Sequence, residues 1–183
     1  MRSLFAARAV VSFAAGILVV FNQGHYVALS LLALTLFGLG IAVSQLAIAL
    51  FGKRGLAAVE SIPTAIISLS IGAIAGLAAV QAPQATPNVV IQEFEWLVTG
   101  WALTSGAFEL YLGRRAGFKS GLGRDWGILA ALSLALGTAL LVLETDRTTT
   151  VGLFVTYLMF SAVHLGLAAA SPKPAVGNAP EAK

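Results

Sequence analysis

Long apolar stretches separated by short polar breaks run along the whole chain. Six of them cover residues 4–21, 27–51, 56–80, 94–113, 126–143 and 149–170. A bilayer core of roughly 30 Å needs about 20 apolar residues in a helix, and each stretch comes close to that length. The pattern therefore predicts an all-α, polytopic membrane protein with six transmembrane helices. We expect one domain over residues 1–170 and a disordered cytoplasmic tail over 171–183.

Basic residues fall almost entirely on one side of this arrangement. Ten of them lie on the side of the two termini and of the second and fourth breaks: Arg2, Arg8, Lys53, Arg54, Arg114, Arg115, Lys119, Arg124, Lys173 and Lys183. Only Arg147 lies on the other side. Cytoplasmic loops are enriched in Lys and Arg, so this bias predicts that both termini are cytoplasmic. Arg8, inside the first stretch, is expected to snorkel to the surface.

Composition excludes several classes of protein. The chain is 58% apolar and 10% charged, whereas soluble domains are about 45–50% apolar and about 25% charged. The net charge of +3 is small and scattered, which argues against a nucleic-acid surface. The absence of Cys and the presence of only two His exclude thiolate and His-rich metal sites, and we expect no cofactor. Phosphate-binding loops, nucleophile elbows and zinc-type His spacings are also missing from the sequence, which predicts a non-enzymatic protein.

The chain contains an internal repeat of helical hairpins. Gly16, Gly72 and Gly137 stand in similar apolar surroundings in the first, third and fifth stretches, and a polar residue stands near the cytoplasmic end of each even-numbered stretch. These polar residues are Gln45, Glu109 and His164. The spacing predicts three tandem hairpins. If the hairpins pack around a pseudo-threefold axis, the three polar side chains meet, and we treat them as a candidate intramembrane polar site.

Glu109 is the only carboxylate well inside a stretch. A carboxylate in hydrocarbon is costly and usually faces the protein interior or water, which makes Glu109 a candidate proton-responsive group. The alternative is a surface pair with Arg114. His164 could act as a pH switch, since imidazole changes charge near neutral pH, or as a packed polar residue with one interhelical hydrogen bond. Gln45 is expected to hydrogen-bond between helices.

Two further groups of residues have a functional and a structural interpretation. The acidic and histidine residues on the predicted outer face either bind cations or sense acid, or are solvated charges near helix starts: Glu93, Glu95, Glu144, Asp146 and His25. Small residues spaced four apart, such as Gly72 and Gly76, either form a face for a homo-oligomer or a larger membrane complex, or pack helices inside one bundle.

The segments GAFEL at 106–110, RR at 114–115 and WGIL at 126–129, leading into Gly137, resemble the HdeD-like acid-resistance membrane proteins. The resemblance is clearest over residues 94–170. It implies a six-span protein of the bacterial cytoplasmic membrane, built from short tandem repeats, with a link to acid or stress tolerance. It implies no catalytic residues, and Gln45 and His164 depart from it at the positions that match Glu109. Two other functions stay open: an accessory subunit of a larger membrane complex, and a small proton-linked transporter or channel.

Overall fold

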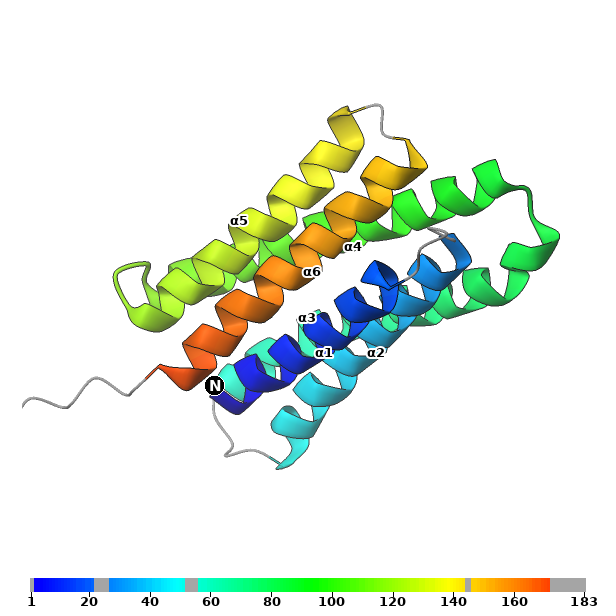
Figure 1. Ribbon diagram of the computed structural model, residues 1–183. Helices are drawn as coiled ribbons and strands as arrows, with labels where there is room; N and C mark the ends of the chain where they lie inside the picture. The colour runs from blue at the N-terminus through cyan, green and yellow to red at the C-terminus, as the bar shows by residue number, and fades with distance from the viewer. Residues whose placement is uncertain (1, 22–26, 52–55, 144–145, 172–183) are drawn as a thin grey trace, which may run out of the picture.

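The computed structural model describes residues 2–21, 27–51, 56–143 and 146–171, and these ranges form an all-α protein (Figure 1). The helices are α1 (Arg2–Val20), α2 (Val27–Phe51), α3 (Leu56–Gln81), α4 (Pro87–Ala116), α5 (Gly121–Val142) and α6 (Arg147–Ala170), with a short 3-10 turn, η1 (Ala82–Gln84), between α3 and α4. The predicted helical class is confirmed. Except for Ser171, the predicted disordered tail lies outside the described residues.

Four helices begin earlier than their apolar stretches, and three of them, α4, α5 and α6, have a local signal at the new start. α4 begins at Pro87, seven residues before the predicted start, because proline is well suited to the first position of a helix. α5 begins after Ser120, whose hydroxyl accepts a hydrogen bond from the Gly123 amide at 3.0 Å. α6 begins after Asp146, which caps the helix in the same way. A first-turn proline in α4 and capping side chains in α5 and α6, rather than the edge of the apolar run, set these boundaries.

The most extensive helix contacts join α2 to α3, α4 to α5 and α1 to α6. The pairs within each predicted hairpin, such as α5 and α6, are packed less closely. Figure 1 shows α1 in blue beside α6 in orange, so the first and last helices are neighbours, and the start of α1 and the end of α6 lie at the same end of the bundle. The Arg2 guanidinium donates to the Ser171 carbonyl there. Each even-numbered helix therefore packs on the odd-numbered helix that follows it, and the α6–α1 pair closes the set.

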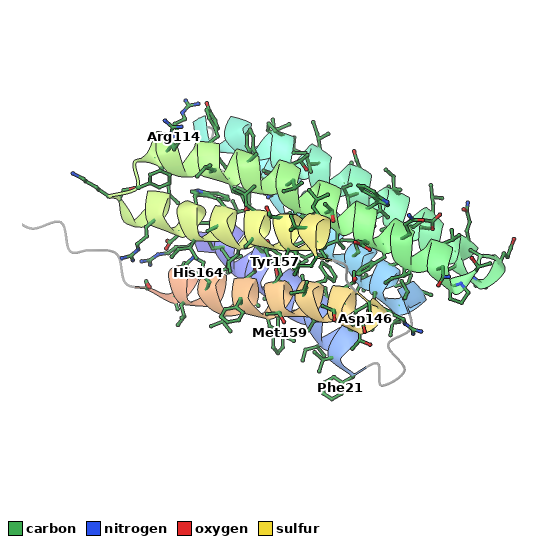
Figure 2. The ribbon with its side chains drawn as sticks, turned by 90° about the horizontal axis from the view of Figure 1, so that it is seen from above. Phe21, Arg114, Asp146, Tyr157, Met159 and His164 are labelled. Carbon is green, nitrogen blue, oxygen red and sulfur yellow. The ribbon has the colours of Figure 1, made fainter. Side chains whose placement is uncertain are left out.

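The even-numbered helices also contact one another, and each brings one aromatic ring to the contact. Phe37 of α2 lies 4.9 Å from Trp101 of α4, and Trp101 lies 5.3 Å from Tyr157 of α6, measured between ring centroids. Phe37 and Tyr157 complete the triangle at 6.4 Å. All three pairs are edge-to-face, the arrangement that the ring quadrupole favours. Figure 2 places Tyr157 in the interior, between the end with Asp146 and the end with His164.

The buried positions of the even-numbered helices repeat with fixed offsets. Equivalent buried sets are Leu34, Phe37, Ala42 and Gln45 in α2; Val98, Trp101, Gly106 and Glu109 in α4; and Phe154, Tyr157, Ala162 and Leu165 in α6. The equivalence of Gln45 and Glu109 agrees with the predicted alignment. In α6, however, Leu165 takes that position, one residue after His164. The predicted alignment of α6 was therefore displaced by one residue.

The odd-numbered helices repeat as predicted around their glycines. Gly16, Gly72 and Gly137 are all buried, and each follows a buried serine by four residues: Ser12, Ser68 and Ser133. A Cβ atom built on Gly72 would lie 2.9 Å from the Leu39 amide nitrogen of α2, and one built on Gly38 would lie 2.6 Å from the Ser68 carbonyl oxygen of α3. At these positions small residues let helices inside one bundle approach closely.

The exterior of the bundle is apolar. Every described α helix exposes large hydrophobic side chains, for example Phe13 of α1, Leu36 of α2 and Phe160 of α6. α1, α2, the segment Ile62–Gln84, α5 and α6 are long and apolar enough to cross a membrane. α4 does not belong to this set; it is 30 residues long but carries several polar residues, including Glu109. An apolar surface of this extent is stable in lipid but not in water, so the chain is a polytopic helical protein suited to a membrane.

Candidate functional site

A buried ion pair joins α1 to α4. The Arg8 guanidinium (Nη2) lies 2.5 Å from Glu109 Oε1, and the two side chains are only 4% and 1% exposed. The prediction that Arg8 snorkels to the surface is wrong, because a buried carboxylate lies within its reach. Glu109 forms this pair rather than the alternative surface pair with Arg114, which is exposed. A charge pair of this kind is stable in a low-dielectric interior only when each charge balances the other.

Two hydroxyl groups extend the pair to α5 and α6. Ser133 Oγ lies 3.0 Å from Glu109 Oε2 and 3.2 Å from the Tyr157 hydroxyl. A hydroxyl has one hydrogen and a carboxylate only accepts, so Ser133 donates to Glu109 and accepts from Tyr157. Tyr157 is also a member of the central aromatic triangle. The network thus connects the ion pair directly to the axis of the bundle.

The other face of the guanidinium lies against aromatic side chains. Arg8 Cζ is 5.5 Å from the centroid of the Trp126 ring, and Trp126 packs edge-on against Phe5. Trp126 is buried inside the protein. Arg8 Nε and Nη1 have no hydrogen-bond partner among the described residues. The Arg8 guanidinium therefore forms an ion pair with Glu109 and a cation–π contact with the Trp126 ring.

Gln45 takes part in a separate, neutral contact. Its Oε1 accepts a hydrogen bond of 2.7 Å from the Thr64 hydroxyl of α3, and both residues are buried. Gln45 Nε2 has no hydrogen-bond partner among the residues that the structure describes. The contact lies within the α2–α3 pair. It fits the expected role of Gln45 as a hydrogen-bonding residue between helices.

His164 lies apart from both of these contacts. Its Nε2 is 4.0 Å from Asp125 Oδ1 of α5, and the two side chains are 20% and 19% exposed. The pair borders a pocket of about 560 Å³ that Arg124 and Ser171 also line. Figure 2 places His164 toward the end of the bundle that carries Arg114.

The three candidate residues thus have three different partners. Within the described residues, no hydrogen bond or ion pair joins two of Gln45, Glu109 and His164. The residues that meet near the axis are Phe37, Trp101 and Tyr157 instead. Sequence reasoning missed Arg8 and Ser133 as partners of Glu109, and Tyr157 as the partner of Ser133. For Arg8 a signal was present, since a basic residue and a carboxylate both stood within apolar stretches.

The predicted outer-face residues are exposed or half-exposed where the structure describes them. Glu93 is exposed and Glu95 is half-exposed, while Glu144 and His25 lie outside the described residues. Asp146 accepts a hydrogen bond from the Thr149 amide at 2.8 Å. Hydrogen bonding to Thr149 favours the ionised carboxylate and lowers the pKa of Asp146 below its ordinary value. Asp146 therefore acts as a helix cap.

Within the described ranges, no group of three His, Asp or Glu side chains is placed to hold a metal ion. Comparisons with protein-family models, with curated proteins and with solved structures find no match for this chain.

Proposed function

We propose that this chain is a non-enzymatic integral protein of the bacterial cytoplasmic membrane that crosses it six times, with both termini in the cytoplasm. We further propose that it is HdeD-like and contributes to acid or stress tolerance. The buried Arg8–Glu109 pair carries the proposal, because protonation of one carboxylate changes the charge balance of the interior. In this proposal α4 also crosses the membrane, in addition to the five segments that are apolar enough to do so. The ion pair with Arg8 lowers the free-energy cost of burying the Glu109 carboxylate.

The proposed mechanism is a proton-dependent change in helix packing. At low pH a proton on Glu109 would remove the charge that balances Arg8, and a cation would remain buried beside Trp126. Such an uncompensated charge is strongly unfavourable. The pair lies between the α1–α6 and α4–α5 helix pairs, and Ser133 and Tyr157 belong to the same network. Loss of the pair would therefore weaken the contact between two parts of the bundle.

Packing at the axis favours this interpretation over a transporter or channel. Phe37, Trp101 and Tyr157 are almost completely buried, and their rings contact one another where a central pathway would run. The case for an accessory subunit is also weaker, because Gly38 and Gly72 are used for packing inside the bundle. Both functions remain alternatives that co-purification and transport assays would test.

The experiment is survival after acid shock in a strain that lacks this chain. The strain would be complemented with the wild type, Glu109→Gln, Arg8→Gln or, as a matched control outside the network, Glu95→Gln. We expect rescue by the wild type and by Glu95→Gln, and loss of rescue by the other two at equal membrane abundance. Equal rescue by the wild type and all three variants would remove the role of the ion pair. If deletion has no effect, the acid-tolerance proposal itself fails.

A further inference from the structure

A groove lies between the last third of α3 and the first third of α4, at the end of the bundle that η1 closes. Its volume is about 630 Å³, which is within the range of small-molecule sites, about 300–1,000 Å³. α3 and α4 contact each other much less than α2 and α3 do, and this looser packing leaves room for the groove. No member of the Arg8–Glu109 network lines the groove.

The lining of the groove combines polar and apolar side chains. Gln81, Gln92 and Glu93 are polar, and the apolar members are Ile74, Leu77, Val89 and Leu97. Such a lining suits a molecule with a polar head and a hydrocarbon chain.

The polar end has the chemistry that recognises an ammonium group. Glu93 and Trp96 are three residues apart on α4, so they share one face of the helix, and both line the groove. Trp96 is 63% exposed, and Glu93 has no hydrogen bond or ion pair with any described residue. A carboxylate and an indole ring that line the same groove can both attract a cation, the carboxylate by its charge and the ring by its quadrupole.

We infer that this groove binds a single-chain cationic amphiphile, with its ammonium head at Glu93 and Trp96 and its chain against the apolar side chains of the groove. Charge complementarity decides the class of ligand. None of the groove-lining residues is Lys, Arg or His, so the phosphate of a zwitterionic phospholipid would have no cationic partner. An amphiphile whose head carries only an ammonium group leaves no such charge unpaired.

The test uses the full chain in dodecyl maltoside micelles, titrated with octyltrimethylammonium. The readout is the fluorescence of Trp96, identified as the part of the signal that Trp96→Phe removes. We expect a saturable change, and Glu93→Gln should weaken the apparent affinity about three- to tenfold. Glu95→Gln is the matched control, because it removes the same charge from α4 outside the groove; we expect its affinity to stay within about twofold of the wild type.

Two further arms separate the site from general partitioning into the micelle. Octyl sulfate has the same chain and the opposite charge, and we expect at least about tenfold weaker binding that Glu93→Gln does not reduce. Ala78→Phe places a ring in the groove and should abolish the saturable signal while the melting temperature shows that the protein is folded. Equal effects of Glu93→Gln and Glu95→Gln, equal binding of the two amphiphiles, or unchanged binding by folded Ala78→Phe would each overturn the inference.

Discussion

Arg8 and Glu109 are 101 residues apart in the chain, yet they form a buried ion pair between the first and fourth helices. Each belongs to a different closely packed helix pair, α1 with α6 and α4 with α5. Through Ser133 and Tyr157 the pair reaches the aromatic rings at the axis. The ion pair therefore links α1 to α4, two helices that are not consecutive in the chain.

Removing one member of the pair should cost more than removing both. Arg8→Leu or Glu109→Leu alone leaves an uncompensated buried charge, and we expect each to lower the free energy of unfolding by about 3–5 kcal/mol. The double variant contains neither charge and should be more stable than either single variant. Unfolding in detergent followed by circular dichroism measures all four proteins. Additive losses in the double variant would mean that the two side chains do not depend on each other.

The contact between α2 and α3 requires glycine at position 38. A Cβ atom there would lie 2.6 Å from the Ser68 carbonyl oxygen and 2.8 Å from Gly72 Cα, and neither backbone atom can move freely. We expect Gly38→Ala to destabilise the protein by about 1–3 kcal/mol. Gly100→Ala is the control, because a Cβ atom there meets no atom within 4 Å. It should leave the stability unchanged or raise it by about 0.5–1 kcal/mol.

The aromatic triangle should contribute strongly to the stability of the bundle. Phe37 is 1% exposed and contacts both Trp101 and Tyr157, so Phe37→Ala should cost about 3–5 kcal/mol. Phe160 provides the comparison, since it is also on an even-numbered helix but is 62% exposed. Phe160→Ala should change the stability by no more than about 0.5 kcal/mol. Similar losses in the two variants would show that the central rings are not tightly packed.

Asp146 should make the start of α6 sensitive to acid. Because its pKa is lower in the folded protein than in the unfolded chain, the cap stabilises the protein above the ordinary Asp pKa. This stabilisation is lost as the pH falls through the lowered value. Asp146→Asn keeps a capping oxygen and should show less change in melting temperature over that acid range, while Asp146→Ala should melt lower at neutral pH. Identical pH profiles for the wild type and Asp146→Asn would exclude this contribution.

The proposed orientation can be tested with single cysteines, because the chain has none of its own. Lys119→Cys lies between α4 and α5, and Gln84→Cys lies in η1; both positions are exposed. With cytoplasmic termini, a membrane-impermeant maleimide added to intact cells should label position 84 but not position 119. Labelling in the reverse pattern would place the termini on the outer side, and labelling after cell lysis verifies that both thiols are reactive.

Hydrophobic patterning predicted the six helices well, and the limits of that pattern are equally clear. Apolar runs located every helix in the described residues, but the runs began after Pro87 and Gly121. The start of α4 is marked by a proline and that of α5 by the Ser120 cap, and neither signal is part of an apolar pattern. The repeats also indicated that Gly16, Gly72 and Gly137 are equivalent. In α6, the pattern of polar residues predicted that His164 is equivalent to Gln45 and Glu109, whereas the pattern of buried residues shows that Leu165 is the equivalent residue. A match of residue type did not determine the rotational register of the helix.

Hydropathy and spacing were enough to predict the helical class, the number of helices in the described residues, the repeat and one carboxylate, Glu109, well inside an apolar stretch. Tertiary structure alone decided that α2 pairs with α3 and α6 with α1, that aromatic rings occupy the axis, and that Arg8 is the partner of Glu109. The physical reason is that lipid and a neighbouring helix are both apolar, so hydropathy does not distinguish the faces that touch each of them. The buried faces depend on close fit and on polar partners that only the packed bundle brings together.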